Sequence, residues 1–459
     1  MVAGLLGQPD RVPPPVPRVT GIDTSRFLRP PPQDPRSEQW ATFVAQACRY
    51  GMETWYADRG YDRLAGFIVP RSRRNVEVRP LGAYAETCAV ALATGAYADT
   101  FFPGGEPAAG DTAAAVATPD DVLRRTIRLI VGVARSNQAN GGLWGGSSPV
   151  PHGTDSTNLA APVMLAAWLL WPHLAPAETD LVVAMADYEA ERLMAVPIRY
   201  YRDREGKILT PGDSGSEELV WNATFLSLMV NMFGDDPRRE AWERRLVAST
   251  LAAWARPADL DRPDPFHGRP LAEWLHGSNL NADGTLANGG IEVNPFYMSA
   301  IANSVFQAAA FALGGRPTPA SATFNVAAVH DALATRRFDV KNGFKSPGGT
   351  MYVDGRPDLY YPRGNRKQTN VYGAFAFVDW TAARFTEGET AVRADRWEGI
   401  HLGGAVAMQR RFADGRSNLT EAEGGAEEEF WVAYWAARAY LMRWLDHQVG
   451  FEFHNLPYE

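Results

Sequence analysis

Carboxylates and an amide lie close together in the segment TPGDSGSEELVWNATFLSLMVNMF (210–233). Glu218 and Asn222 are four residues apart, so a helix would place them on one face near its start. Asn222 stands among apolar residues, and a buried amide needs a hydrogen-bond partner, either a loop carbonyl or a ligand. Ser214 and Glu217 form an S-x-x-E pattern directly before the apolar run. That pattern predicts a capping box and a structural role for Glu217.

A second group of polar side chains ends an Asn- and Gly-rich stretch. Asn294 and Pro295 predict a helix start, with Asn as the cap and Pro in the first turn. Tyr297 then lies in that first turn, where its phenol can exchange a proton with a ligand. His276 and Asn288 approach from the preceding loop. The structural alternative for Tyr297 is a packed ring with a satisfied hydroxyl group.

A third group lies in the Gly-rich segment NGGLWGGSSPVPHGTDSTNLAAP. The glycines around Trp144 leave its ring face accessible, which suits stacking on a sugar. His152, Asp155 and Asn158 follow, and Asn158 falls in the first turn of a predicted helix. Asp155 or Ser156 can instead serve as the N-cap of that helix. We therefore expect either ligand contacts or a helix cap here.

A fourth group is basic and rich in tyrosine, in a chain whose formal net charge is −8. The segment SPGGTMYVDGRPDLYYPRGNRKQTNVYGAFAF includes Tyr360, Tyr361, Arg363, Arg366 and Tyr372. Arginine forks recognise carboxylate or phosphate groups. A purely solvated loop has no need of so many tyrosines, so we predict ligand contact for this segment.

Several classes of site and of protein are not supported. The eight histidines form no HxxxH or HExxH pattern, so no metal is expected, and no nucleotide-binding or nucleophile-elbow motif predicts a cofactor or a GxSxG hydrolase. The negative charge argues against nucleic acid as a partner. No run of 18 apolar residues and no signal-like N-terminus occurs, so a cytoplasmic protein without a membrane span is expected. Cys48 and Cys88 lie in apolar stretches and are expected to be buried thiols, although a disulfide stays open.

The elements that must position these groups are helices. Apolar residues recur with helical spacing in twelve segments. These segments cover 38–57, 82–97, 119–137, 157–171, 178–194, 217–233, 238–255, 295–313, 324–336, 370–386, 389–410 and 427–448. Alternation with a period of two is scarce and predicts only minor hairpins, at 198–209 and 348–355. The chain is therefore expected to be all-α.

The lengths of the connections suggest how the helices are arranged. From the third helix onward long loops alternate with short ones, and stacked antiparallel helices place successive loops on opposite faces. One face is then elaborated, and every even-numbered helix begins on it. No repeated sequence period indicates an open solenoid. We predict one closed (α/α)6-type toroid over 38–459, preceded by an extended, Pro-rich arm at 1–37.

This layout resembles the toroid domains of polysaccharide lyases and glycoside hydrolases. NGGLW before a helix is similar to an Asn-Trp loop of chondroitin- and hyaluronate-type lyases, and ADGTLANGGIEVNPFYM is similar to their Asp-Gly-Ser/Thr loop. The resemblance implies that Tyr297 matches the catalytic tyrosine, and that Asn158 or Asn222 neutralises a substrate carboxylate. Asn288 and Gly289 stand where those lyases carry a histidine, and their β-sandwich domains are missing.

The resemblance implies a carbohydrate-active enzyme that cleaves an acidic saccharide, as a monomer or small homo-oligomer. In β-elimination, Tyr297 or Tyr372 would remove a proton, and Asn222 with Arg363 or Arg366 would stabilise the enolate. This lyase reaction is our first expectation.

The alternative enzyme is an inverting glycoside hydrolase with two carboxylates. Its candidates are Asp155, Asp213, Glu218, Glu292 and Asp358. A toroid that binds a glycan or a protein without turnover is the third possibility.

Overall fold

The structure is a computed structural model of the chain, and it describes residues 18–59, 75–97, 117–145, 155–364, 372–418 and 425–458. Within these ranges the side chains at 75–77, 155 and 425–427 lie outside the description.

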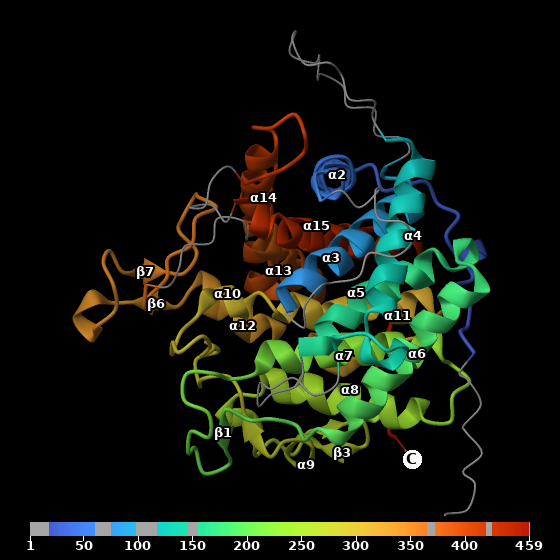
Figure 1. The fold of residues 1–459 in the computed structure, drawn as a ribbon. Coiled ribbons are helices and arrows are strands. Elements are labelled where there is room, and N and C mark those ends of the chain that lie inside the picture. Colours follow the sequence, from blue (N-terminus) through green and yellow to red (C-terminus); the bar gives the residue numbers. More distant parts are fainter. Residues whose placement is uncertain are drawn as a thin grey trace, which may run out of the picture.

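The described residues contain twelve long helices in two layers (Figure 1). The inner layer is formed by α3 (Asn75–Ala93), α5 (Asp155–Leu169), α7 (Ser216–Met232), α11 (Ile301–Leu313), α13 (Tyr372–Phe385) and α15 (Gly425–Gln448). The outer layer is formed by α1 (Pro35–Arg49), α4 (Pro119–Arg135), α6 (Pro176–Ala195), α8 (Arg239–Trp254), α12 (Val326–Ala334) and α14 (Gly388–Gln409).

The inner helices form a closed ring. Each of α3, α5, α7, α11, α13 and α15 packs against the next, and α15 packs against α3. The outer helices cover this ring: α4 and α6 contact α5, α8 contacts α7, α12 and α14 contact α13, and α1 contacts α15 and α3. The fold is therefore an (α/α)6 toroid, and the predicted fold class is confirmed.

All twelve predicted helices correspond to observed ones, with two instructive differences. α3 begins at Asn75, seven residues before the predicted start, and it therefore contains Pro80, which the predicted helix does not include. Pro normally ends a helix at the preceding residue. The predicted helix 295–313 is divided into α10 (Pro295–Met298) and α11, and Asn294 with Pro295 begins it as expected. A π-helical stretch (Tyr50–Trp55) and α2 (Tyr56–Asp58) extend α1.

Short strands and turns connect the helices in the described part of the chain. β1 (Arg202–Asp203) pairs with β4 (Gly277–Ser278), β2 (Pro265–Phe266) with β3 (Arg269–Pro270), β6 (Arg337–Phe338) with β7 (Gly349–Thr350), and β5 (Thr318–Pro319) with β8 (Phe453–His454). The first three pairs are antiparallel, and Arg202 lies opposite Ser278. A small helix, α9 (Leu271–Trp274), follows β3.

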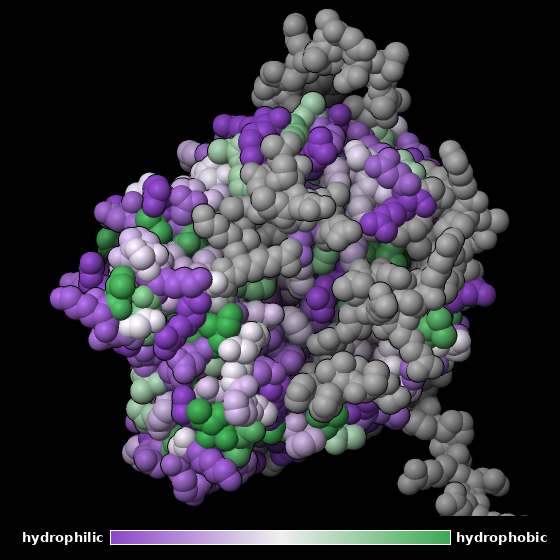
Figure 2. Space-filling model, turned by 60° about the vertical axis from the view of Figure 1, so that its left-hand side comes forward, coloured by the Kyte–Doolittle hydropathy of each residue, from purple (hydrophilic) through white to green (hydrophobic). Residues whose placement is uncertain are grey.

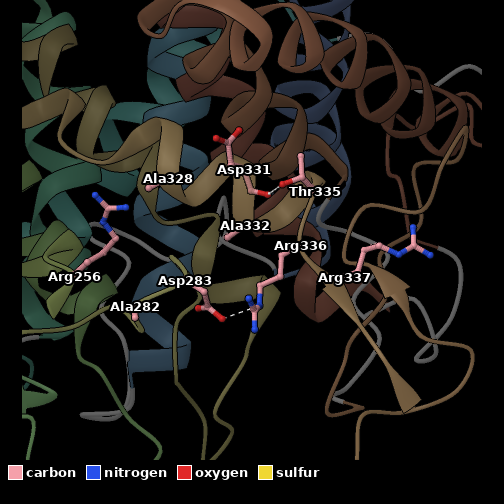
Figure 3. Close-up of a pocket in the computed structure, with 9 residues that line it drawn as sticks. All are labelled: Arg256, Ala282, Asp283, Ala328, Asp331, Ala332, Thr335, Arg336 and Arg337. Carbon is pink, nitrogen blue, oxygen red and sulfur yellow. Dashed lines mark hydrogen bonds and ion pairs between the residues drawn. The ribbon is translucent and has the colours of Figure 1, made fainter. Parts of the chain in front are cut away.

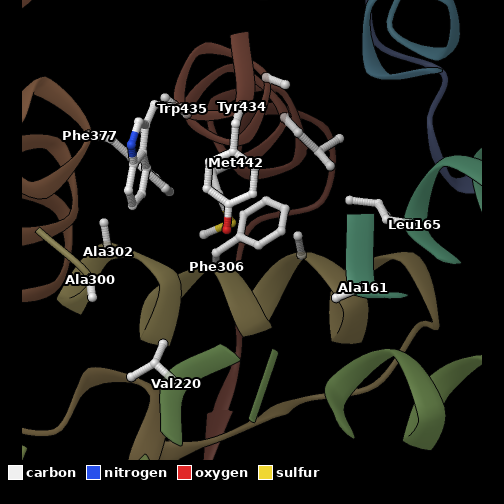
Figure 4. Packing of buried hydrophobic residues seen from close by; sticks show 14 of the residues in the cluster. Ala161, Leu165, Val220, Ala300, Ala302, Phe306, Phe377, Tyr434, Trp435 and Met442 are labelled. Carbon is white, nitrogen blue, oxygen red and sulfur yellow. The ribbon is translucent and has the colours of Figure 1, made fainter. Parts of the chain in front are cut away.

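The centre of the ring is packed with large apolar side chains. Phe306 on α11 and Tyr434 on α15 both lie against the guanidinium group of Arg438, and Phe377 and Trp435 pack beside them (Figure 4). Inner helices of this kind are apolar on nearly all sides, because both layers of the toroid cover them. The ring is therefore filled by side chains at this level and is no open channel.

A buried ion pair crosses this core. Arg438 on α15 donates from Nε and Nη2 to the two carboxylate oxygens of Glu86 on α3, at 2.7 and 3.0 Å, and from Nη1 to Asn303 Oδ1 at 2.9 Å. The side chains of Arg438 and Glu86 are 2% and 0% exposed. Burial of this depth leaves the charges in low dielectric, so each charge depends on the other for compensation.

A second buried polar cluster joins α13 to the outer layer. Asp379 accepts a hydrogen bond from Tyr352 (2.8 Å) and contacts His330 Nε2 (3.1 Å) and His401 Nδ1 (2.6 Å). Burial acts to raise the pKa of Asp379, but the charge of His401 and the bonds to both histidines outweigh it, so the pKa is lowered. The carboxylate thus anchors Tyr352, and with it the chain that follows β7.

The segment before α1 crosses the end of the ring where the inner helices finish. Thr20 N–H donates to Met232 O at the end of α7, and Trp168 near the end of α5 donates to Thr20 O. Arg26 donates to Ala312 O on α11. The opposite end of the ring, where the inner helices begin, carries the long loops.

Two further expectations concern thiols and membrane spans. Cys48 and Cys88 are buried free thiols, so no disulfide joins them. Among the described residues one helical segment, Pro295–Leu313, is long and apolar enough to cross a membrane, but 89% of it is buried inside the protein. It is a core helix of the toroid. Outside the grey residues, Figure 2 shows hydrophilic side chains over most of the visible face and apolar ones in small groups.

Candidate active site

The N-terminal ends of four inner segments meet at one end of the ring. Arg79, near the start of α3, lies over Trp221 of α7 and Trp431 of α15, with its guanidinium carbon 5.7 and 5.2 Å from the ring centroids. Tyr297 in α10 is close enough for the charge of Arg79 to act on its hydroxyl group. All three aromatic side chains are partly exposed. We call these four residues the aromatic entrance.

Three carboxylates lie beside the aromatic entrance. Asp213, Glu217 and Glu218 place carboxylate oxygens within 4.8 Å of one another, and we call them the acidic cluster. Glu217 and Glu218 belong to the first turn of α7, and Asp213 precedes that helix. The charges of all three act on Tyr297. The predicted candidates Glu218, Asp213 and Tyr297 therefore share one site.

Two polar side chains from outside α7 hold the acidic cluster in place. Asn288 Nδ2 donates to Glu217 Oε1 at 2.5 Å and to Asp213 Oδ1 at 3.4 Å. Arg199 forms ion pairs with Asp213 (2.7 Å) and with Glu218 (3.5 Å). The predicted ligand residue Asn288 is therefore a partner of the carboxylates, and it approaches from the loop as expected.

The backbone before α7 brings the cluster together. Gly215 is the N-cap of α7 and has φ +67°, a conformation that residues with a Cβ rarely adopt. A Cβ atom there would lie 2.9 Å from Glu218 Oε2 and 3.1 Å from Arg199 Cδ. Glycine at this position therefore gives Glu218 and Arg199 the space in which they meet.

The capping box predicted for Ser214 and Glu217 does not form. Ser214 N–H donates to Ala287 O at 2.9 Å, and the N-cap of α7 is Gly215, without a side-chain cap. The left-handed turn at Gly215 moves the helix start past Ser214. Glu217 is thus released from the capping role and faces Asn288 instead.

The surroundings of Glu217 favour its protonated form. The side chain is nearly fully buried, at 6% exposure. Burial raises the pKa of Glu217 well above its ordinary value, and the negative charges of Glu218 and Asp213 raise it further. Its hydrogen bond from Asn288 opposes this rise without cancelling it. A buried carboxyl group with a raised pKa holds its proton to a higher pH than an exposed glutamate does, which suits general-acid chemistry.

Tyr297 has surroundings that hold its proton. Burial raises the pKa of Tyr297 to about 12, and the neighbouring carboxyl groups of the acidic cluster act in the same direction, whereas the charge of Arg79 acts to lower it. β-Elimination by a tyrosine base requires a lowered pKa, which adjacent cations would supply. The phenol is therefore a hydrogen-bond donor here rather than a ready base.

Three predicted amides lie in or beside the first turns of the inner helices. Asn222 Oδ1 accepts a hydrogen bond from Thr157 at 2.7 Å, so it joins α7 to α5. Asn158, also on α5, is 4% exposed, and its Nδ2 has no hydrogen-bond partner among the described residues. Asn294 donates to Asn288 O at 3.1 Å and supports the loop behind the acidic cluster. Asn222 thus has a structural partner.

Trp144 is not an accessible stacking platform, and that expectation is wrong. Its ring is 2% exposed, and its indole nitrogen donates to Val133 O and Ser136 Oγ at 2.9 and 3.0 Å. A buried indole needs such an acceptor. The glycine beside it serves a close contact instead: a Cβ on Gly145 would lie 2.3 Å from Glu189 Oε1.

Glu189 anchors the start of α5 in the same region. It accepts hydrogen bonds from Asn137 (2.9 Å), Ser156 (2.6 Å) and Arg192 (3.0 Å). Ser156 therefore lies inside α5 as part of this network and is not its N-cap. The side chain of Asp155, as well as His152 and Arg366, lies outside the described residues.

Residues 336–364 form a lobe that projects from the body beside this face, at the left of Figure 1. Within it Tyr360 and Tyr361 are largely buried. The hydroxyl group of Tyr360 donates to Lys345 O, and Arg363 pairs with Glu292 at 2.6 Å. These polar groups hold the lobe together, and the predicted ligand contact of this segment stays a prediction.

Two other predicted residues have partners outside the acidic cluster. Tyr372, in the first turn of α13, donates to Asp358 Oδ1 in the lobe at 2.9 Å. His276 is exposed and packs edge-on against Tyr200, with ring centroids 6.4 Å apart.

A cavity of about 430 Å³ lies between the 282–283 turn and α12 (Figure 3). Its charged groups are mostly engaged with each other or with neighbouring residues. Asp283 pairs with Arg336 at 2.7 Å, Asp331 pairs with Arg393, and Arg256 pairs with Asp259 at 3.4 Å. These pairs satisfy most of the charges in the lining, and the side chain of Arg337, which also lines the cavity, points away from the Asp283–Arg336 pair (Figure 3). We therefore assign no site to this cavity.

The acidic cluster can be weighed as a cation site. Carboxylate oxygens are ligands for hard cations, but Ca²⁺ takes six to eight oxygens. The cluster supplies three carboxylates, two of which already face Arg199. The raised pKa of Glu217 also favours a proton over a cation at that group. The cluster is therefore poorly suited to a hard cation.

Sequence reasoning missed four residues of this site. Arg79, Trp221 and Trp431 come from three different helices and share no local motif, and Arg199 lies in a loop without one. The available signal for Trp221 and Trp431 is their position near the starts of even-numbered helices, which are predicted to begin on the elaborated face.

The sequence matches no known protein family, and no curated protein matches it. One similar solved structure is an unsaturated glucuronyl hydrolase from Streptococcus agalactiae, with a TM-score of 0.42 and 12% identity over 92% of this chain and 96% of that one. The toroid is established here by the contacts among the helices themselves.

Proposed function

We propose that the protein hydrolyses a glycosidic bond in an acidic saccharide, with Glu217 as the general acid. The observation that carries the proposal is the buried, proton-holding Glu217 beside two carboxylates that face Arg199. Glycoside hydrolases usually use two carboxyl groups whose environments give them different pKa values, so that one acts as an acid and the other as a base or nucleophile. The site lies where the inner helices begin, at the end of the ring with the long loops.

In this reaction Glu217 gives its proton to the glycosidic oxygen as the bond to the anomeric carbon breaks. Asp213 is the second group, because its side chain is the more exposed of the two remaining carboxylates, at 35% against 15% for Glu218. Arg199 and Asn288 orient it. It attacks the anomeric carbon or takes a proton from water.

The spacing of the carboxylates bears on the stereochemical course. Inverting enzymes separate their two carboxyl groups by roughly 6.5–9.5 Å to admit water, and retaining enzymes by roughly 5–5.5 Å. One oxygen from each carboxylate of the acidic cluster lies within 4.8 Å of the others, which leaves less room for a water molecule than the inverting spacing does. We therefore propose retention, with Asp213 as nucleophile, whereas the hydrolase alternative from the sequence was an inverting one.

The aromatic entrance supports an acidic sugar as the substrate. Trp221 and Trp431 are partly exposed and offer flat apolar surface to a pyranose, and the positive charge of Arg79, which lies over both rings, makes this surface favourable for an acidic sugar. The sequence favoured β-elimination on the same class of substrate. The raised pKa of Tyr297 disfavours that reaction, since the phenol must first lose its proton.

The test is an incubation with oligosaccharides that contain uronic acids. Hydrolysis yields new reducing ends without an unsaturated product, whereas elimination yields a product that absorbs in the ultraviolet. We expect reducing ends, lost in Glu217→Gln and kept in Tyr297→Phe. Ultraviolet absorbance that disappears in Tyr297→Phe would establish the lyase instead. Binding without turnover would indicate a glycan-binding toroid.

A further inference from the structure

A groove runs between the lobe and the start of α13. It has a volume of about 660 Å³. Its lining includes Arg337, Lys345, Arg356, Tyr360, Tyr361 and Tyr372. We propose that this groove binds an anionic group of the same saccharide chain, a carboxylate or a sulfate, several sugar units from the bond that is cleaved. This inference rests on the proposed function for the identity of the ligand as a saccharide.

The charge of the groove favours an anion. Asp354 pairs with Arg396 at 3.0 Å, and Asp358 lies 3.8 Å from Arg356. Arg337 and Lys345 form no ion pair with any residue that the structure describes, and both are exposed. Among the described residues, the positive charges of Arg337 and Lys345 on the groove wall are therefore not neutralised by an ion pair.

The position of Arg337 is well suited to a ligand in the groove. It belongs to β6, whose partner β7 also lines the groove at Gly349 and Thr350. In Figure 3 its side chain points away from the Asp283–Arg336 pair, toward the side of the lobe. A guanidinium group held on a strand is more rigid than one on a free loop, so it loses less entropy on binding.

The aromatic walls of the groove are fixed before any ligand arrives. The Tyr360 hydroxyl group is bound to Lys345 O, and the Tyr372 hydroxyl group is bound to Asp358. Asp379 anchors Tyr352 at the base of the same lobe. Rings held in this way offer flat apolar faces to a sugar with little ordering cost.

A chain of contacts joins the groove to the acidic cluster. Arg363 of the lobe pairs with Glu292, in the loop that also carries Asn288. Asn288 in turn donates to Glu217. Tyr372 extends the link, because it lines the groove from the first turn of an inner helix. The lobe that forms the groove is therefore attached to the loop that supports the acidic cluster.

The experiment measures binding apart from turnover. A uronate oligosaccharide, a sulfated one and a neutral one of equal length are titrated calorimetrically into the protein carrying Glu217→Gln. The same titrations follow with Arg337→Ala and Lys345→Ala added together. Lys341→Ala, an exposed lysine of the same lobe outside the groove lining, is the matched control.

We expect the double substitution to weaken binding of an anionic oligosaccharide roughly tenfold, and added salt to have a similar effect. The neutral oligosaccharide and the Lys341→Ala control should show no change. Whether the carboxylate or the sulfate ligand binds more tightly identifies the anion.

Unchanged affinity for both anionic ligands in the double variant would overturn the inference, even if the protein cleaves them. Equal weakening for the neutral ligand would do the same, because it would indicate damage to the lobe rather than loss of charge recognition. Binding that follows the prediction in a protein that cleaves nothing would overturn the proposed reaction and leave the anion subsite standing.

Discussion

Replacing Glu217 with glutamine separates a catalytic role from a structural one. The amide has nearly the same shape as the carboxyl group, and its oxygen can still accept the hydrogen bond from Asn288. It has no proton to give to a leaving oxygen. We expect kcat on uronate oligosaccharides to fall by about 10²–10⁴-fold, which is the usual contribution of a positioned acid.

The same substitution should raise the free energy of unfolding at alkaline pH, although it removes activity. Burial and the charge of Glu218 raise the pKa of Glu217 in the folded state, so the folded protein binds this proton more tightly than the unfolded chain. Stability is then fully present below the ordinary glutamate pKa and declines as the pH rises toward the folded value. Each unit of difference is worth about 1.4 kcal/mol. Glutamine removes this decline.

Urea unfolding of both proteins at acidic and at mildly alkaline pH checks the reasoning. Glu217→Gln should match the wild type at acidic pH and exceed it at alkaline pH, with catalysis lost at both. Glu240→Gln, a half-exposed carboxylate on α8, should change neither property. A variant that is less stable at every pH would show a structural Glu217. Retained activity would refute the general-acid role.

Three further predictions concern other parts of the molecule. Arg438→Met leaves Glu86 buried without its partner and should cost about 3–5 kcal/mol of unfolding free energy by urea titration; Glu86→Gln in the same chain should restore part of it. Asp379→Asn should destabilise the protein at neutral pH, because a lowered pKa contributes stability above the ordinary aspartate value; this difference should shrink below about pH 4, as thermal melts can show. Gly215→Ala should lower the free energy of unfolding by about 1–2 kcal/mol, because alanine is strained in the left-handed conformation. It should also lower kcat, because the added Cβ displaces Glu218 and Arg199. Urea unfolding and rate measurements on the same variant separate the two effects.

The fold could be predicted from the sequence, because apolar periodicity and loop length are local features of the chain. Apolar periodicity located all twelve long helices, and the alternation of loops indicated a closed double layer. The start of α3 was missed because Pro80 is tolerated inside it, where the packing of α5, α15 and α4 outweighs the local cost.

The site could be predicted only in part, because its chemistry depends on contacts between segments that are distant in the sequence. The motif before α7 predicted a cap for Glu217, whereas the positive φ of Gly215 shifted the helix start and freed the carboxyl group. Glycines around Trp144 suggested an open ring, but its indole N–H bonds to Val133 O inside the core. Arg79 carries no local pattern that marks it.

The most direct test of the account is cleavage in water enriched in heavy oxygen, followed by mass spectrometry of the products. Hydrolysis through Glu217 and Asp213 predicts one heavy oxygen at the new reducing end for every bond that is broken, and none in the Glu217→Gln variant. Products with an unsaturated ring and no heavy oxygen would contradict the account and assign the reaction to elimination.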